Sequence, residues 1–468
     1  MSHHPQVDAV AALADSQRAE TLDLLCSYLR IPAISCLEAH RPDVERLAVK
    51  VRDEIADMGF DNARLLELPG AHPCVAAEWL HAGSDKPTVL IYGHLDLQPV
   101  EPENWRTDPH TPTVVGDRLY ARGAADDMGG WVSHIGALRA WFALAGGPPC
   151  NLKLIIEGEE EIGSPNLERF MDAHPSAFAS DVMVLTDCEN PSTEIPGLTV
   201  SLRGLLEVKL TCSALSADVH SGLWGGMVPD VSMALTQLIT RLSDADGRMA
   251  VGRVEVDEAR KAAGQNIVFA DAVIREGAHL IDGVDPLPVR DRSAAEWMWW
   301  QPSVTVVATT LPTLERKKNA LRREASAILS VRLAPEQTAD EMLAALREVL
   351  LVQPPAGVDV ALAADGWSGE GWLYTPKGPA FEAADRAYEK AWGRPLVQVG
   401  VGGSIPFVAL FGRRFGDLPL ILNGVMDPVT TAHGPNESLH LGIFRKAIAA
   451  NVYLLDELAA LGSTLISG

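Results

Sequence analysis

Two kinds of hydrophobic pattern alternate along both ends of this chain. Short apolar runs are typical of strands buried on both faces, and longer stretches with apolar positions three and four residues apart are typical of helices. The expected strands lie at 88–93, 151–157 and 181–186, and the expected helices at 8–30, 43–58, 129–145 and 165–173. Strands that alternate with helices predict an α/β fold with a mostly parallel sheet and helices on both faces.

The pattern changes after Arg203. Residues 204–213 alternate between apolar and polar positions, as in a half-exposed antiparallel strand. Further strands are expected near 303–310, 325–333 and 418–423, and further helices near 228–243, 337–350 and 377–392. The last strand and helix restore the α/β pattern. We therefore predict an α+β domain at 204–373, inserted into a discontinuous α/β domain at 1–203 and 374–468.

The composition is that of a soluble globular protein. The chain has 468 residues, of which 47% are hydrophobic and 22% charged, and this length is enough for two domains. The formal charge of −23 would repel phosphate backbones, which argues against a nucleic-acid partner. No apolar run reaches membrane-spanning length and the first residues lack a signal-peptide pattern, so we expect no membrane partner and a cytoplasmic location.

Acidic or imidazole side chains follow each of the first three predicted strands. They are His94 and Asp96 after 88–93, the glutamates within 157–161 after 151–157, and Asp187 after 181–186. The carboxyl ends of parallel strands meet at one edge of a sheet, so these groups should converge. The spacing of His94 and Asp96 puts both side chains on one side of an extended backbone, where the carboxylate can orient the imidazole toward a metal.

Two further candidates follow other elements. Asp126 precedes the helix at 129–145, where it could instead be a helix cap, and His433 follows the strand at 418–423, where it could instead be a surface histidine. The glutamates at 157–161 could likewise form a solvated loop. Together, such groups at one sheet edge indicate bound cations, because clustered charge is costly unless it is neutralised. The six cysteines are scattered without a Cys-x-x-Cys pair, so imidazole and carboxylate would hold Zn²⁺ or Mn²⁺.

A set of short motifs runs along nearly the whole chain. They are Gly-His94-Leu-Asp96-Leu-Gln-Pro, Tyr120-Ala-Arg-Gly-Ala-Ala-Asp126-Asp127-Met-Gly-Gly, Glu157-Gly-Glu-Glu160-Glu161-Ile-Gly-Ser, Asp187, His220-Ser-Gly-Leu-Trp-Gly-Gly, Gly402-Gly-Ser404-Ile-Pro and Ala432-His433. In content and order they resemble the di-metal aminopeptidase-type family of carnosinase-like dipeptidases, aminoacylase, carboxypeptidase G and succinyl-diaminopimelate desuccinylase. The Leu-Gln-Pro and His-Ser-Gly stretches resemble the dipeptidase branch.

The resemblance implies a complete set of metal ligands. Asp126 would bridge two divalent cations, zinc in the first place and manganese as the alternative. His94 and Asp187 would complete the first site, and Glu161 and His433 the second. The inserted domain would then act as a lid and as the dimerisation domain of a homodimer.

The resemblance also implies the groups that act around the metals. Glu160 would be the general base for a water molecule, and Asp96 would orient His94 from behind. The peptide bond between Asp126 and Asp127 would be cis, a costly conformation that is tied to function where it occurs.

The substrate-binding candidates each have a second interpretation. His220 could simply start a helix, but in dimeric relatives this histidine enters the partner's active site and stabilises the oxyanion. Arg332 could be an exposed strand residue or a clamp on the substrate's terminal carboxylate. Gly403 and Ser404 could form an ordinary turn or donate hydrogen bonds to the same carboxylate. Val401 stands where relatives often have an acidic residue, which leaves the substrate open.

The sequence therefore predicts a metal-dependent hydrolase of small peptides with a free carboxylate, in the first place a dipeptidase. An N-acyl or N-carbamoyl amino acid amidohydrolase with the same site is the alternative, and a non-catalytic metal-binding dimer is a more remote one. The aromatic run at 297–300 precedes a strand of the inserted domain, and we expect a core patch there rather than a substrate-stacking surface.

Overall fold

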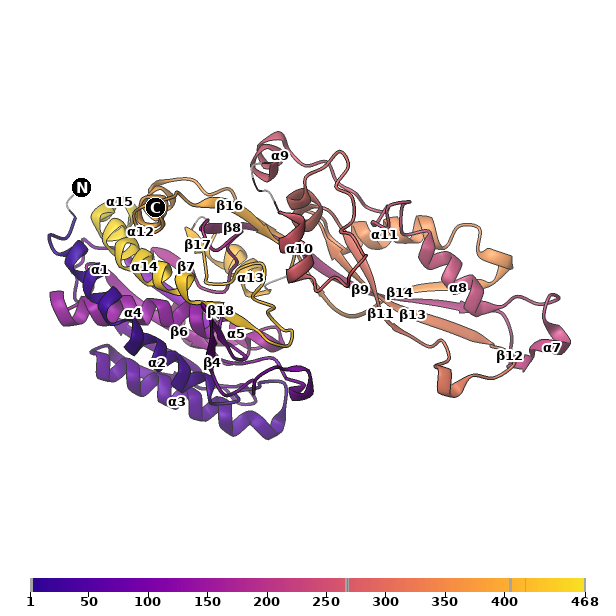
Figure 1. The fold of residues 1–468 in the computed structure, drawn as a ribbon, viewed down its shortest axis with the longest axis horizontal. Coiled ribbons are helices and arrows are strands. Elements are labelled where there is room, and N and C mark those ends of the chain that lie inside the picture. Colours follow the sequence, from indigo (N-terminus) through magenta and orange to yellow (C-terminus); the bar gives the residue numbers. More distant parts are fainter. Residues whose placement is uncertain (1–2, 266, 268, 404–405, 417, 467–468) are drawn as a thin grey trace.

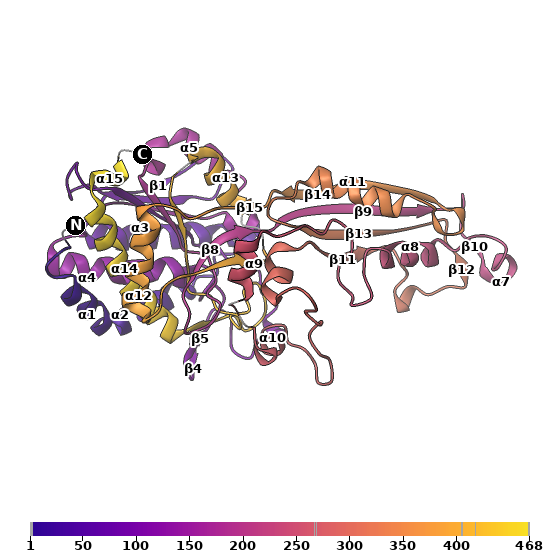
Figure 2. The same ribbon diagram turned by 90° about the horizontal axis from the view of Figure 1, so that it is seen from above.

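The protein is elongated and has two parts that follow one another along its long axis (Figures 1 and 2). This computed structural model describes residues 3–265, 267, 269–403, 406–416 and 418–466. The first part holds both ends of the chain, and the second part extends away from it. In the part of the chain that the structure describes, no helix is both long and apolar enough to span a membrane.

A six-stranded sheet forms the centre of the first part. Its strands, in spatial order, are β1 (Asp61–Leu66), β2 (Cys74–Trp79), β6 (Asn151–Glu157), β3 (Thr88–His94), β7 (Val182–Leu185) and β17 (Leu420–Leu422). Strand β3 is parallel to both β6 and β7, and β17 is parallel to β7. Strand β2 is antiparallel to both of its neighbours, β1 and β6. The predicted mostly parallel sheet is confirmed.

Helices cover both faces of this sheet, because alternate strand residues point to opposite faces. On β3, Val89 and Ile91 enter one apolar core, and Leu90 and Tyr92 enter the other. The first core is covered by α1 (Val7–Ser16), α2 (Arg18–Leu29), α3 (Arg41–Met58), α4 (Met128–Ala145), α12 (Pro379–Trp392) and α14 (Leu441–Leu461). The second is covered by α5 (Leu167–Ala173), α6 (Pro175–Phe178) and α13 (Pro406–Phe415). The helix expected at 8–30 is interrupted at Gln17.

The second part is built on a four-stranded antiparallel sheet. Its strands, in spatial order, are β11 (Ser303–Thr309), β13 (Glu324–Leu333), β9 (Gly204–Ser213) and β14 (Asp359–Gly369). Helices α8 (Val231–Thr240) and α11 (Ala339–Leu350) share one apolar core with this sheet. Buried and partly exposed positions alternate along β9, as its sequence pattern predicts.

Smaller elements connect the two parts and form their tips. The junction has a three-stranded sheet of β15 (Trp372–Leu373), β8 (Gly197–Leu202) and β16 (Val397–Val401). Near it lie α9 (Glu258–Gln265), α10 (Asp271–Gly277) and a π-helical turn at Glu296–Trp300. At the far tip are β10 (Val219–His220), β12 (Ala320–Leu321) and α7 (Ser221–Trp224), and beside the first part are β4 (Thr113–Val115), β5 (Arg118–Tyr120) and β18 (Ser438–His440).

Candidate active site

Two groups of potential metal ligands lie at the carboxyl ends of the parallel strands. The structure brings together His94, Glu160 and Asp187 in one group, and Asp126, Glu161 and His433 in the other. Within each group the ligand atoms all lie within 4.8 Å of one another. His94 ends β3, and it pairs in register with Glu157 at the end of β6. The expected convergence of strand ends therefore places these side chains in one region.

Asp126 lies between the two groups. Its Oδ1 atom is 3.2 Å from Nε2 of His94, and its Oδ2 atom is 3.1 Å from Nε2 of His433. Glu161 Oε2 is 3.2 Å from the same His433 nitrogen. The two oxygens of one carboxylate thus face two different histidines, which is the arrangement needed to bridge two cations. Glu160 also approaches the first group, since its Oε2 atom is 3.9 Å from His94 Nε2.

The donor set and its charge fit divalent cations. Four carboxylates and two imidazoles make up the two groups. Burial raises the pKa of Glu160 and of Asp187 well above the usual range of a carboxyl group. Hydrogen bonds with Asp126 and Glu161 raise the pKa of His433 to about 11. The raised pKa values mean that, without a cation, the buried carboxylates tend to be neutralised by protons. Oxygen and nitrogen donors of this kind suit Zn²⁺ or Mn²⁺, which could take the place of those protons.

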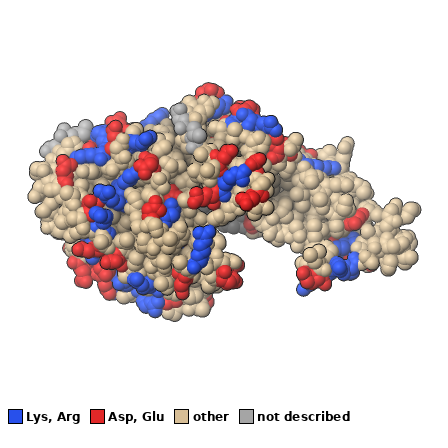
Figure 3. All heavy atoms as spheres, in the orientation of Figure 1, with Lys and Arg blue, Asp and Glu red and all other residues tan. Residues whose placement is uncertain are grey.

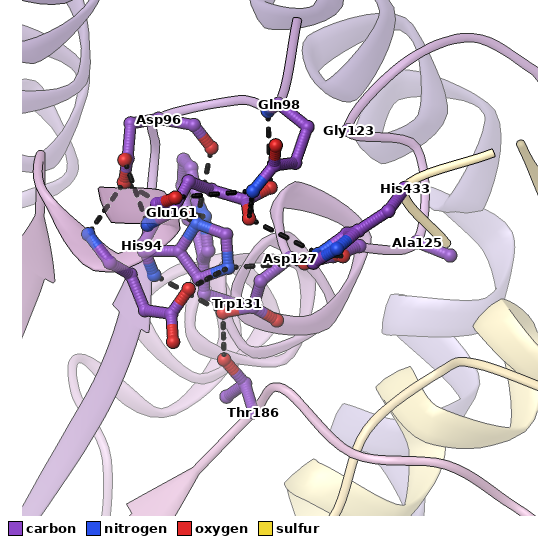
Figure 4. A network of polar contacts seen from close by, with 12 residues as sticks. His94, Asp96, Gln98, Gly123, Ala125, Asp127, Trp131, Glu161, Thr186 and His433 are labelled. Atoms are coloured by element: carbon purple, nitrogen blue, oxygen red, sulfur yellow. Dashed lines mark hydrogen bonds and ion pairs between the residues drawn. The ribbon is translucent and has the colours of Figure 1, made fainter. Parts of the chain in front are cut away.

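Asp96 holds the backbone of the neighbouring glutamates. Its Oδ1 accepts a hydrogen bond from the Glu160 amide at 3.1 Å, and its Oδ2 accepts one from the Glu161 amide at 3.0 Å. His94 Nδ1 is 3.1 Å from the backbone oxygen of Asp96 and 3.5 Å from Oδ1. Gln98, which sequence reasoning missed, donates from Nε2 to Glu161 Oε2 at 2.8 Å (Figure 4). Asp96 thus supports Glu160 and Glu161 as well as His94.

Asp127 connects the loop that carries Asp126 to the ends of strands β3 and β7 through hydrogen bonds. The Asp126–Asp127 bond is cis, as the resemblance implied. Asp127 Oδ2 accepts hydrogen bonds from the His94 amide at 3.2 Å and from Thr186 Oγ1 at 2.7 Å (Figure 4). A Cβ atom on Gly93 would lie only 2.6 Å from the same oxygen, so this strand end has room for glycine alone. The glycine before His94 therefore makes space for Asp127.

A buried ion pair between Arg122 and Glu437, which the sequence did not predict, connects the loop before Asp126 with the loop that carries His433. Glu437 is fully buried and accepts hydrogen bonds from the backbone amides of Gly123, Ala125 and Asp126 at 3.0–3.1 Å. Its Oε2 also accepts from Arg122 Nη1 at 2.7 Å. Arg122 Nη2 in turn donates to the backbone oxygens of His433 and Gly434 at 3.0 and 3.1 Å. The only sequence signal for Glu437 is its position four residues after His433, in a polar loop.

The ligand groups open into a cavity of about 610 Å³, whose lining includes Arg332, Val401 and Gly403. We call this space the metal-facing cavity. Arg203 approaches this end of the cavity, where its Nε atom donates to the backbone oxygen of Gly402 at 2.9 Å. Positive charge therefore lies at the end of the cavity that Arg332 and Gly403 form. Ser404 lies outside the described residues.

His220 lies far from the ligand groups of its own chain. It is exposed at the tip of the second part, beside α7, whereas the strands that carry the ligands lie in the first part (Figures 1 and 2). Its Nδ1 atom accepts a hydrogen bond from the Gly222 amide at 3.0 Å, which is the geometry of a helix-entry residue. Within one chain, His220 does not line the metal-facing cavity.

Comparison with known proteins identifies the family. A sequence model of peptidase family M20/M25/M40 matches residues 90–457, a stretch that contains every ligand candidate. The chain belongs to this family. It is thus a hydrolytic enzyme by membership, and the sequence resemblance is confirmed at this level.

Relatives with dipeptidase names match almost the whole chain. The cysteinylglycine-S-conjugate dipeptidase of Corynebacterium striatum is 32% identical over 420 residues, which cover 89% of this chain and 90% of the relative. The solved structures of the dipeptidase Dug1p from Saccharomyces cerevisiae and of human carnosine dipeptidase 1 both have a TM-score of 0.81 at 23% identity. Each covers 98% of this chain, and the chain covers 99% and 100% of them. This M20 peptidase therefore shares its whole fold with dipeptidases.

Proposed function

We propose that this protein is a dipeptidase that hydrolyses the amide bond of small peptides with two divalent cations. The observation that carries the proposal is the position of Asp126, whose two carboxylate oxygens face His94 and His433 at 3.2 and 3.1 Å. Zinc is the proposed cation and manganese the alternative. Dipeptide cleavage is further supported by the dipeptidase names of relatives that match nearly full length.

Each side chain has a definable task in this reaction. The cations, when bound, polarise the scissile carbonyl and lower the pKa of a water molecule. Glu160, which Asp96 fixes through the Glu160 amide, accepts the proton of that water and passes it to the leaving amine. Arg332 and the Gly402–Gly403 backbone hold the free carboxylate at the positive end of the cavity.

We further propose that residues 204–373 form the dimerisation domain of a homodimer. The tip that carries His220 exposes Leu223, Trp224 and Met227 to 75%, 52% and 82%, which is unusual for large apolar side chains on a monomer surface. The visible face of the second part is mostly uncharged, and a hollow separates it from the first part (Figure 3). In such a dimer, His220 of each copy would reach the active site of the other.

Mixing two inactive variants should test the role of His220 in the dimer. We expect His220→Ala and Glu160→Gln each to be nearly inactive alone, and a refolded or co-expressed mixture to regain activity. In the mixed dimer, one site combines an intact Glu160 with the intact His220 of the other copy. Steady-state rates before and after subunit mixing measure this. If His220 acts within its own chain, mixing restores nothing, and if it has no role, His220→Ala is active on its own.

A substrate panel should separate the proposal from its alternative. We expect turnover of dipeptides with a free carboxylate after Zn²⁺ or Mn²⁺ is supplied, and much weaker turnover of the matching dipeptide amides, because Arg332 loses its partner. Initial rates on dipeptides, their amides, and N-acetyl and N-carbamoyl amino acids would be compared. A preference for the acyl or carbamoyl compounds would replace the dipeptidase by an amidohydrolase, and metal binding without any turnover would favour a non-catalytic dimer.

A further inference from the structure

A second cavity, of about 350 Å³, lies against the metal-facing cavity. Both are lined by Glu189, Met298, Trp299, Met426 and Ala432, so they share a wall beside the ligand groups. The proposed reaction as described above uses none of these residues. The shared wall also contains part of the aromatic run at 297–300.

The unshared lining of this second cavity is mainly apolar. Phe269, Val273 and Ile274 come from the segment at and before α10, and Val399 comes from β16. The ring of Phe269 packs edge-on against Trp299, with centroids 5.6 Å apart. Concave sites with mainly apolar walls and few polar groups are typical binding sites for small apolar groups. We call this space the α10 cavity.

The aromatic run is thus only partly the core patch that its sequence predicts. Trp299 and Trp300 are 4% and 1% exposed and join a small apolar core with Val399. Met298, by contrast, is 43% exposed, and it lines both cavities together with one side of Trp299. The π-helical turn therefore presents one side of the run to the core and another to the α10 cavity.

Two close backbone approaches fix the walls of the α10 cavity. A Cβ atom on Gly277, at the end of α10, would lie 2.4 Å from the backbone oxygen of Pro428, in the loop that leads to His433. A Cβ atom on Gly400 would lie 2.6 Å from Cβ of Trp299. Any larger residue at either position would push the walls apart. The cavity is therefore held at a set position relative to the ligand groups.

The two cavities would receive opposite ends of a bound dipeptide, and this sets the direction in which the dipeptide lies. The carboxylate end is set by Arg332 and Gly403, which line the metal-facing cavity and not the α10 cavity. The shared wall lies next to the ligands instead, because Glu189 follows Asp187 by two residues and Ala432 directly precedes His433. Glu189 lines both cavities, and its carboxyl oxygens can accept hydrogen bonds from a free amino group. The amino-terminal residue, which carries the scissile carbonyl, thus lies beside the α10 cavity.

We propose that the α10 cavity binds the side chain of the substrate's amino-terminal residue, so that the enzyme prefers dipeptides beginning with a bulky apolar residue. This inference rests on the proposed dipeptidase function. It gives the segment around α10 a role in substrate selection.

Filling the cavity tests the assignment. We expect Ile274→Trp to lower the kcat/KM ratio of Leu-Gly to Gly-Gly by on the order of 10-fold, in line with the effect of misfits in apolar pockets. The ratio of Gly-Leu to Gly-Gly should change far less. Ile281→Trp is the matched control, since Ile281 is 73% exposed just after α10 and lines neither cavity. Ile274→Ala provides a second variant, in which Trp-Gly should gain relative to Leu-Gly.

The outcomes are distinct. An unchanged Leu-Gly ratio in folded Ile274→Trp, with no gain for Trp-Gly in Ile274→Ala, would overturn the assignment but leave the dipeptidase function intact. A loss confined to Gly-Leu would overturn it too, because the cavity would then hold the second residue. If the parent enzyme cleaves none of these dipeptides, the proposed function itself fails, and the assignment fails with it.

Discussion

The Glu160→Gln protein should bind its cations like the parent and lose peptidase activity by about 10²–10⁴-fold. Glutamine keeps the size of the side chain but cannot accept the proton of the attacking water. Asp96 would still hold the backbone at residue 160 through a 3.1 Å hydrogen bond to its amide, so the loop should keep its shape. Metal content after gel filtration and kcat on a dipeptide would be measured on the same preparation.

Metal content is the decisive measurement for this variant, because Glu160 also lies in one ligand group with His94 and Asp187. If the variant holds one cation in place of two, Glu160 is a ligand and the base must be sought elsewhere. If it holds both and retains activity, the assigned base is wrong. Glu168→Gln is a matched control, because it makes the same change at an exposed position of α5 nearby. It should leave both measurements unchanged.

The strand ends were predictable because their signal is local. The apolar runs that became β3, β6 and β7 are short, buried and followed at once by His94, the glutamates and Asp187. Parallel topology then brings such ends to one edge without further information. Asp126 and His433 were candidates by position, but no local pattern separates them from a helix cap and a surface histidine, and only the family resemblance implied their ligand roles. The geometry now places both among the possible ligands.

Elements without periodic contrast were missed. Helix α14 covers the sheet over Leu441–Leu461, but buried residues lie on several of its sides because other helices and the sheet surround it, and this weakens the amphipathic signal. Strand β14 passes through a stretch of glycine and tryptophan that resembles a loop, and its register shifts between Ala364 and Ser368. A shift of this kind breaks the alternation that identifies a strand.

Glu437 could not be predicted, because its importance depends on contacts across the fold. It follows His433 in a run of glycine, proline and asparagine, where a glutamate is ordinarily solvated. In the structure the same carboxylate is completely buried, and its partners at 122–126 are more than 300 positions away in sequence. Only the tertiary structure shows that one carboxylate holds the backbone amides of Gly123, Ala125 and Asp126.

The Glu437→Gln protein should bind one of its cations about 10–100-fold more weakly, because groups that orient metal ligands commonly have effects of this size. Glutamine replaces one acceptor oxygen by an amide NH₂. At Oε1 that group would face the amides of Ala125 and Asp126, and at Oε2 it would face Arg122 and the Gly123 amide. In the first case the Asp126 loop should move, and in the second Arg122 should lose the carboxylate that holds it beside the backbone of His433. The cation that Asp126, Glu161 and His433 would hold is the one whose binding we expect to weaken.

Competition with a chelator of known affinity, followed by metal analysis, measures this directly, and circular dichroism shows whether the variant is folded. Glu457→Gln serves as a control, since Glu457 accepts a hydrogen bond from Arg386 at 2.8 Å far from the ligands. A lower melting temperature with unchanged cation affinity would mean that Glu437 only stabilises the fold, as breaking a buried ion pair can do by about 3–5 kcal/mol. Weaker binding of a single cation in a folded protein would instead show that the Arg122–Glu437 pair positions the ligands from two separate loops.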